Sequence, residues 1–271
     1  MASERQGPRF APAVIDAYVA AGWWGTASLA QVVAGHAARR PAAPAYIVAD
    51  AAAPDRVLTW AQYDERSSVL AAILVQAGLE PGDRLAVILP DGATVHTAFL
   101  AAEKAGLVVV GVGARSGPAE IRHLLGRTAA TALVTHGKEV AGGPGLRHIQ
   151  VPDVLQGPAA PVLVDGVAAD PPDAKAADRL LTGRALGPDD LFMINSTSGT
   201  TGLPKCVLHT QNRWFYFHQL AAVAGDLSPD DVFFGAVPAP FGFGLWTAHF
   251  SPAVLGSPTV VATRFDAAAR A

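Results

Sequence analysis

Short apolar runs alternate with helical segments over residues 84–137, and this alternation restricts the fold more than any other feature of the sequence. The runs are typical of strands covered on both faces, and they are "RLAVILP" (Arg84 to Pro90), "LVVVGVG" (Leu107 to Gly113) and "TALVTHG" (Thr131 to Gly137). We predict helices between them, over residues 91–106 and 117–130. Strands and helices that alternate through short connections predict an α/β fold of layered, largely parallel sheets flanked by helices.

Capping residues and further apolar runs extend this pattern in both directions. Ser28 precedes a helical run that ends before Pro41, and Thr59 precedes a second run that stops at Gly78. The remaining predicted elements are strands at 45–50, 191–196, 206–210, 231–238 and 258–265, and a helix at 212–225. The strands at 191–196 and 206–210 are expected to form a hairpin.

A change in composition suggests where the chain divides. Residues 166–179 are rich in Ala, Asp and Pro, which predicts an exposed, flexible loop. The chain has 271 residues, close to the length at which single cores stop growing. We therefore predict a first α/β subdomain over residues 1–188 and the start of a second over residues 189–271.

Charge and cysteine content exclude several classes of function. The formal net charge is −3, so we expect no nucleic-acid partner and no polybasic membrane contact. The single cysteine, Cys206, excludes a disulfide framework and a multi-cysteine metal site. The polar N-terminus has no apolar signal segment, and together with the cysteine content this predicts a cytoplasmic protein.

The segment from Val232 to Thr263 contains no Asp, Glu, Lys or Arg, and its length alone would suggest a membrane span. Prolines and glycines interrupt it repeatedly, and a helix in lipid could not satisfy its backbone through so many breaks. We therefore predict two buried strands and a short helix in this segment, and no membrane span.

A polar stretch, "NSTSGTTGLPKC" (Asn195 to Cys206), lies between the strands of the predicted hairpin. Its glycines let the backbone turn and present N–H groups, its hydroxyl side chains offer further donors, and Lys205 adds a positive charge. These are the groups that bind nucleotide phosphates. The order of residues does not fit a Walker A loop, because Lys205 is not preceded by Gly or followed by Ser or Thr.

"TSGTTGLPK" (Thr197 to Lys205) resembles the phosphate-binding signature of the adenylate-forming superfamily. This superfamily includes acyl-CoA synthetases, aryl-CoA ligases and the adenylation domains of peptide synthetases. Segments that resemble other family segments occur in the family's order, at 58–65, 81–92, 99–112 and 237–244. The chain is thus similar to the N-terminal portion of an AMP-dependent acyl-CoA synthetase or ligase.

The resemblance implies a reaction, cofactors and site residues. A small carboxylic acid would attack Mg-ATP to give an acyl-adenylate, and a thiol such as coenzyme A would then take the acyl group. The implied cofactors are therefore ATP, Mg²⁺ and coenzyme A. The residues implied to bind the nucleotide phosphates are Thr197, Ser198, Gly199, Thr200, Thr201, Gly202 and Lys205. Phe241 and Gly244 are implied to lie beside the acyl pocket, although Phe241 could equally be a core residue in a turn.

Some positions depart from the family pattern. Cys206 replaces the usual Gly, which is costly if the backbone has positive φ there and harmless if the return strand begins there. Ser196 replaces a usual aromatic residue, and Gln211 replaces a frequent His. We expect His209, at a strand end, to be a packing residue rather than a catalytic one.

Family members are nearly twice as long, and their later motifs for adenine, Mg²⁺ and ribose have no counterpart here. Their C-terminal domain, which carries the adenylation lysine, is also absent, so no catalytic residue is assigned. The sequence therefore predicts an incomplete fold with impaired ATP binding and adenylation. The alternatives are a non-catalytic remnant that binds a partner, one half of a split enzyme with a complementing C-terminal chain, and a fragment of a peptide-synthetase adenylation domain.

Overall fold

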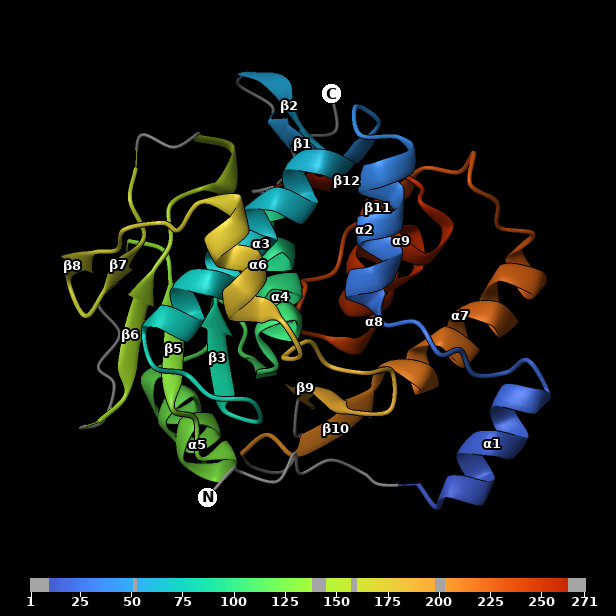
Figure 1. The fold of residues 1–271 in the computed structure, drawn as a ribbon, viewed down its shortest axis with the longest axis horizontal. Coiled ribbons are helices and arrows are strands. Elements are labelled where there is room, and N and C mark those ends of the chain that lie inside the picture. Colours follow the sequence, from blue (N-terminus) through green and yellow to red (C-terminus); the bar gives the residue numbers. More distant parts are fainter. Residues whose placement is uncertain (1–9, 51–52, 138–144, 157–159, 198–202, 263–271) are drawn as a thin grey trace.

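The computed structural model describes residues 10–50, 53–137, 145–156, 160–197 and 203–262. Within these residues the strands form two sheets, with helices around and between them (Figure 1). The larger sheet has the strand order β10 (Cys206–Thr210), β9 (Leu191–Ser196), β4 (Val108–Gly111), β3 (Arg84–Ile88), β5 (Ala132–Thr135), β6 (Arg147–Gln150), β7 (Leu163–Val164) and β8 (Val167–Ala168). The smaller sheet has the order β11 (Phe233–Gly235), β12 (Thr259–Ala262), β1 (Pro44–Asp50) and β2 (Ala53–Thr59).

Parallel pairing dominates the centre of the larger sheet. The run β9–β4–β3–β5–β6 is parallel throughout, and antiparallel pairs occur only at its two edges, β10 on β9 and β7 with β8 beyond β6. In the smaller sheet, β12 is parallel to both β1 and β11, and β2 is antiparallel to β1. The predicted α/β fold with largely parallel sheets is confirmed.

Both sheets take strands from each side of the division suggested between residues 188 and 189. Strand β9 pairs with β4 in the larger sheet, and β12 pairs with β1 in the smaller one. The division does not coincide with a separation of the sheets, and the two subdomains remain a prediction.

The helices cover the sheets and fill the space between them. They are α1 (Pro12–Ala20), α2 (Leu29–Arg39), α3 (Trp60–Gln76), α4 (Ala93–Ala105), α5 (Pro118–Thr128), α6 (Ala174–Leu181), α7 (Gln211–Gly225), α8 (Gly242–Leu245) and α9 (Ser251–Leu255), with a 3₁₀ turn η1 (Val154–Gln156) and a π-helical segment η2 (Trp246–Phe250). Helix α4 contacts β1 of the smaller sheet and β3 and β4 of the larger one, so it lies between the two sheets. Every residue of α4 except Thr94 is buried, including the polar residues His96, Thr97, Glu103 and Lys104.

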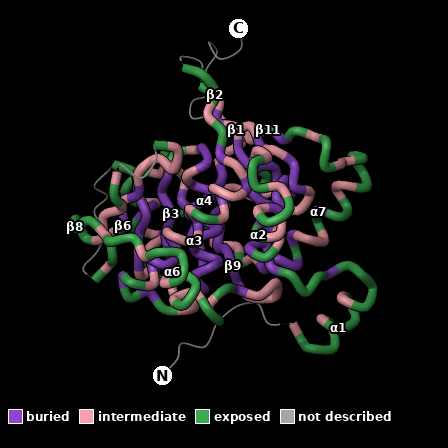
Figure 2. Tube along the Cα trace, turned by 45° about the horizontal axis from the view of Figure 1, so that its top comes forward, coloured by how far each residue is buried: buried purple, intermediate pink, exposed green. Residues whose placement is uncertain are grey.

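The core lies on both faces of the larger sheet. In β3, Leu85 and Val87 belong to the cluster on one face, whereas Ala86 and Ile88 belong to the cluster that packs against α5 on the other. Successive strand residues point to opposite faces, so a strand covered on both needs a continuous apolar run. Figure 2 shows this buried centre around β3, α3, α4 and β9, with the exposed α1 outside it.

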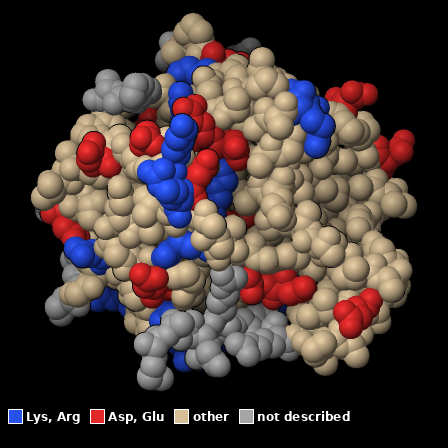
Figure 3. All heavy atoms as spheres, in the orientation of Figure 1, with Lys and Arg blue, Asp and Glu red and all other residues tan. Residues whose placement is uncertain are grey.

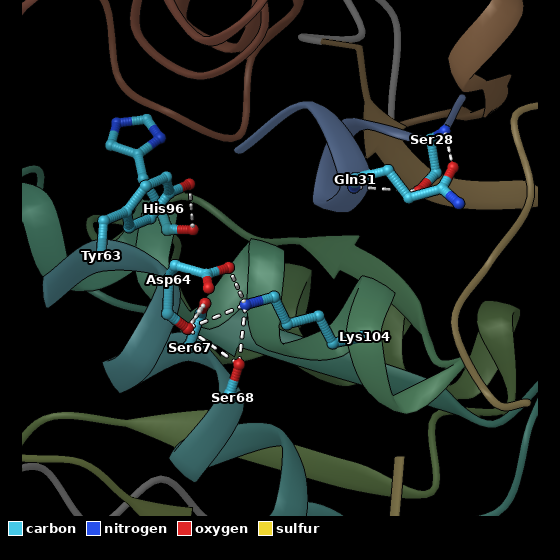
Figure 4. A network of polar contacts seen from close by, with 8 residues as sticks. All are labelled: Ser28, Gln31, Tyr63, Asp64, Ser67, Ser68, His96 and Lys104. Carbon is cyan, nitrogen blue, oxygen red and sulfur yellow. Dashed lines mark hydrogen bonds and ion pairs between the residues drawn. The ribbon is translucent and has the colours of Figure 1, made fainter. Parts of the chain in front are cut away.

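The helix starts predicted from sequence are confirmed in detail. The Ser28 hydroxyl accepts a bond from the Gln31 backbone N–H, and the Gln31 side chain accepts from the Ser28 N–H, which forms a capping box at α2 (Figure 4). Thr59 and Gln62 form the same arrangement at α3. Capping can be predicted from sequence because both partners lie within one turn.

The structure corrects the prediction of a flexible loop over residues 166–179. This stretch contains β8 and the first six residues of α6. Asp173 is the N-cap of α6, and its side chain accepts a hydrogen bond from the Ala176 N–H at 2.8 Å. The prolines of this stretch all precede this cap. The helix beyond it follows the period of its few apolar residues and buries Ala177.

The uncharged segment after residue 231 folds back on itself. It contains two strands as predicted, although β11 is shorter than residues 231–238. The short helix predicted between the strands is instead the succession α8, η2 and α9, with Pro252 in the first turn of α9. No helix in the described ranges combines the length and the apolar character that a membrane span requires.

The surface of the described residues carries both signs of charge without segregation. Figure 3 shows Lys and Arg interleaved with Asp and Glu on the left and centre of the face shown, whereas the right side is mostly uncharged. Exposed apolar side chains on α7 include Phe217, Leu220 and Val223.

Candidate functional site

The predicted phosphate loop closes the hairpin formed by β9 and β10. All six positions of β9 are buried, and its last residue, Ser196, pairs with Cys206 of β10. One step farther out, the Thr197 N–H donates to the Lys205 carbonyl at 3.0 Å. The hairpin therefore holds the two ends of the loop side by side. Ser198, Gly199, Thr200, Thr201 and Gly202 lie outside the described residues.

The described ends of the loop face solvent at the carboxyl edge of the parallel sheet. Thr197 and Lys205 are both exposed, and the Pro204 carbonyl lies 3.1 Å from His123 Nε2 on α5. Ligands of parallel α/β sheets bind at this edge, where strands end and loops begin. The structure thus places one hydroxyl and one ammonium group where an anion could approach from solvent.

The unusual Cys206 is accommodated without strain. It begins the return strand, and it is not among the described residues that have positive φ. Its side chain packs against the core cluster beneath α5, and burial raises the pKa of its thiol. Of the two possibilities open from the sequence, the harmless one is realised.

His209 supports the hairpin from the side. Its Nε2 lies 2.8 Å from Asn195 Oδ1, so the neutral ring donates across the β9–β10 pair, and the ring also contacts Trp214 with centroids 5.3 Å apart. Burial, reinforced by Arg213, lowers the pKa of His209 to about 4. The ring is therefore neutral at pH 7 and stabilises the base of the loop.

Replacing His209 by Gln is expected to weaken the pH dependence of folding. The unfolded histidine binds a proton below pH 6.5, but the folded one does not until about pH 4, so stability is lost as the pH falls through this window. Gln can still donate to Asn195 but does not titrate. Urea unfolding between pH 4 and 7 should show that unfolding of H209Q takes up about one proton fewer than wild type. Parallel stability curves would contradict the assignment.

A turn from Val237 to Gly244 packs across the ends of β4 and β9. A Cβ added to Gly111, at the end of β4, would lie 2.9 Å from Pro240 Cβ, and one added to Gly113 would lie 3.7 Å from Phe241 Cζ. A Cβ on Gly242 would lie 3.9 Å from Asn195 Nδ2. The structure therefore brings the half-buried Phe241 to the carboxyl edge of the sheet from which the β9–β10 hairpin projects, and its place beside an acyl pocket remains a prediction.

Residue 244 must be glycine because there is no room for a Cβ atom, and not because of its backbone angles. A Cβ at this position would lie 2.2 Å from the Pro238 carbonyl oxygen and 2.5 Å from that of Val237. Gly244 is buried at the first helical turn after Phe241, so its role is to let the turn close tightly. It shapes the wall behind Phe241 without offering a side chain to a ligand.

A small cavity of about 140 Å³ lies beside this edge, at the ends of β3 and β5. Its lining includes Arg56, Asp91, Thr94 and Asp153, and Arg56 and Asp153 form an ion pair of 2.8 Å. The Asp91 side chain accepts from the Ala239 N–H at 2.9 Å and so fixes the turn that carries Phe241. The volume is below that of pockets that enclose a drug-sized ligand.

Comparison with known proteins decides the family. The model of the family described as AMP-binding enzyme matches residues 33–271. The chain belongs to this family. Curated proteins similar to it include adenylate-forming ligases.

Two curated relatives bear names that specify an aromatic acid. The salicyl-AMP ligase / salicyl-S-ArCP synthetase of Mycobacterium tuberculosis is 33% identical over 260 residues, which cover 91% of this chain and 43% of the relative. The salicylyl-CoA synthase / salicylate adenylyltransferase of a Streptomyces species is 31% identical over 227 residues, or 75% of this chain and 38% of the relative. The chain spans less than half the length of either enzyme.

Two solved structures show a similar fold. The apo structure of MbtA from Mycobacterium smegmatis matches with a TM-score of 0.74 and 25% identity, over 95% of this chain and 48% of that one. The N-terminal subdomain of Klebsiella oxytoca NpsA, in complex with 3-hydroxybenzoyl-AMSN, matches with a TM-score of 0.65 and 22% identity, over 85% and 52% of the two chains.

Several residues that shape this site were not found from the sequence. Asn195 and Asp91 fix the hairpin and the turn through contacts with residues distant in the chain. Asn195 belongs to the polar stretch and Asp91 to a segment with family resemblance, but neither pattern indicated its partner. Local sequence carries no signal for a bond such as that between Asp91 and Ala239, whose members are 148 positions apart.

Proposed function

We propose that the chain carries the phosphate-binding part of an ATP-dependent, AMP-forming acid–thiol ligase. The ligase would activate a small carboxylic acid as an acyl-adenylate and then transfer the acyl group to a thiol. The observation that carries the proposal is that the loop ends, Thr197 and Lys205, and the turn with Phe241 both lie at the carboxyl edge of one parallel sheet. Membership of the AMP-binding family supports the use of ATP.

The residues at the loop ends suit a triphosphate. Lys205 is exposed and brings a compact positive charge, and Thr197 is an exposed hydroxyl donor on the strand that leads into the loop. We assign phosphate binding to Thr197, Ser198, Gly199, Thr200, Thr201, Gly202 and Lys205. When Mg²⁺ is bound, it supplies further neutralisation of phosphate charge. The residues of this chain would orient the nucleotide and stabilise charge that develops on its phosphates.

The acid is assigned to the side of the site where Phe241 lies, with the close-packed Gly244 behind it. An aromatic acid is favoured over other small acids, because the names of both relatives specify salicylate and about a third of the aligned positions are identical to this chain. The thiol in our first proposal is coenzyme A, as in the name of the Streptomyces relative. A carrier protein is the second candidate, favoured by the synthetase activity in the name of the mycobacterial relative.

The activity of the whole ligase requires more than these 271 residues in our proposal, since the relatives are more than twice the matched length. A complementing chain could supply the remainder. A non-catalytic, partner-binding role is the alternative from a different class. The experiment below separates these possibilities.

Lys205→Ala is expected to reduce ATP–pyrophosphate exchange by about 10²-fold, since it removes one charge from the phosphate site. Exchange would be measured with a panel of aromatic, alicyclic and fatty acids, with the chain alone and with the protein encoded immediately downstream. Lys175→Ala, at an exposed position on α6, is the matched control and should leave exchange unchanged.

Each outcome of this assay has a defined meaning. Exchange that needs the second protein and is lost in K205A supports a split ligase, and exchange by the chain alone supports a self-sufficient one. Exchange that survives K205A contradicts the assignment of the phosphate site. No exchange from folded protein in either mixture supports the non-catalytic role.

A further inference from the structure

A carboxyl group lies buried in the core behind the candidate site. Glu103, on α4, is 1% exposed, and its Oε2 accepts a hydrogen bond from Gln211 Nε2 at 2.9 Å. Its Oε1 has no hydrogen-bond partner but lies 3.7 Å from Nε2 of His249, whose exposed fraction is 0%. Buried carboxyl groups are rare unless they are paired, so this arrangement requires an explanation beyond packing.

The two partners of Glu103 come from the two segments that build the site. Gln211 is the first residue of α7 and directly follows β10, the return strand of the phosphate-loop hairpin. His249 lies in η2, which continues directly from α8, the helical turn that begins after Phe241. The segment η2 is π-helical, a form that occurs mostly as single turns at functional sites. Glu103 therefore contacts the first residue of α7 and a residue of η2 from within the core.

Other ionisable groups near Glu103 are engaged elsewhere or held neutral. The adjacent Lys104 points to α3, where its ammonium group donates to Asp64 and Ser68, as Figure 4 shows. On the other side, His96 stacks on His249 with ring centroids 5.5 Å apart, and burial lowers the pKa of His96 well below its usual value. Tyr63, from α3, is also buried and donates to the His96 carbonyl (Figure 4).

Each oxygen of the Glu103 carboxyl group faces a different neighbour, Gln211 or His249. Burial raises the pKa of Glu103, and the contacts with His249 and Gln211 oppose this rise. Oε2 accepts from the Gln211 amide, which leaves Oε1 to face His249 Nε2 at 3.7 Å. Removing the carboxyl group would leave the buried Gln211 amide without its partner and would take away the polar group that faces His249. A buried amide left unpaired has a cost.

We propose that Glu103 is a positioning residue of the site assigned above, which holds the phosphate-loop hairpin and the Phe241 segment in a fixed relation through Gln211 and His249. The site in question rests on the proposed function, but the link itself does not depend on any ligand. Its role is to couple the conformation of the hairpin to that of the Phe241 segment.

Hydrogen exchange of two backbone amides tests the link without nucleotide. The Thr197 amide reports on the hairpin, because it donates to the Lys205 carbonyl, and the Leu245 amide reports on the Phe241 turn, because it donates to the Phe241 carbonyl at 2.8 Å. The Val151 amide, bonded to the Thr135 carbonyl at 2.9 Å, is the remote reference. In Glu103→Ala we expect Thr197 and Leu245 to exchange about tenfold faster relative to Val151.

Two variants separate positioning from general support of the core. Glu103→Gln can accept from Gln211 and keeps a polar group beside His249, so it should restore both amides to within about twofold of wild type. Lys104→Met alters the next residue of the same helix on its opposite side and should affect the three amides alike. His249→Phe keeps the aromatic packing and severs one side only, so it should speed Leu245 about tenfold and leave Thr197 nearly unchanged. This last variant also tests the link if Glu103→Ala fails to fold.

The proposal is overturned if all three amides accelerate equally in the Glu103 variants, or if Glu103→Gln exchanges as fast as Glu103→Ala. It is also overturned if His249→Phe leaves Leu245 at the wild-type rate. Because no ligand is present, a chain without ligase activity can still show the link, and an active ligase can still lack it. The two proposals therefore fail independently.

Discussion

Gly244→Ala is expected to lower the free energy of unfolding by about 3 kcal/mol or more, as overpacked cores do when the obstructing atoms belong to the backbone. The new methyl group would lie 2.2 Å from the Pro238 carbonyl oxygen and 2.5 Å from that of Val237. Neither oxygen can move without opening the turn that carries Phe241. The same change should therefore impair the candidate site as well as stability. Urea unfolding measures the loss of stability.

Gly126→Ala is the matched control for this prediction. Gly126 lies in α5, and a Cβ there would meet no atom within 4 Å. Alanine in a helix is more stable than glycine by about 1 kcal/mol, so this variant should be slightly more stable than wild type. If Gly244→Ala were as well tolerated as Gly126→Ala, the claim that the turn leaves no room for a side chain at residue 244 would be contradicted.

Lys104→Met is expected to cost about 2–4 kcal/mol, because it removes one partner of a largely buried ion pair. The side chain of Lys104 is 10% exposed and that of Asp64 28%, and their charged atoms are 2.7 Å apart. The ammonium group also donates to the Asp64 carbonyl and to Ser68 Oγ, each at 2.8 Å, so all its protons are used (Figure 4). Methionine fills a similar volume, which confines the loss to charge and hydrogen bonding.

The exposed pair of Arg147 and Asp165 provides the comparison. Its side chains are 52% and 40% exposed, although the charged atoms approach to 2.5 Å. Surface ion pairs contribute about 0–1 kcal/mol, so Arg147→Met should fall within that range. Denaturant unfolding of both variants at pH 7 tests the contrast. Equal losses would show that burial does not determine the contribution of the Lys104 pair.

Local patterns predicted the elements of this fold well. The continuous apolar residues of β3 indicated burial on both faces, and the structure shows a core on each side of that strand. Ser28 and Thr59 indicated the helix starts because a cap and its partner lie three residues apart. Predictions of this kind succeed where the interacting groups are close in sequence.

The same patterns failed where tertiary contacts determine structure. Residues 174–181 form α6 despite their loop-like surroundings, and η2 adopts a π-helical form that no local signal indicated. The division of the chain near residue 188 remains a prediction, but composition did not indicate that β9 and β12 pair across it with strands far earlier in the chain. Strand pairing over such distances has no counterpart in local composition.

For the candidate site, the sequence by itself determined which residues we propose as phosphate ligands. The order of residues from Thr197 to Lys205 indicated a phosphate loop, and the comparisons placed the chain in the AMP-binding family. This was possible because the donors of a phosphate loop are contiguous in the chain. Only the tertiary structure decided that the Phe241 turn packs against the ends of β4 and β9, and that Glu103 contacts both Gln211 and His249. These relations depend on how two sheets pack around α4, which brings together groups more than a hundred positions apart.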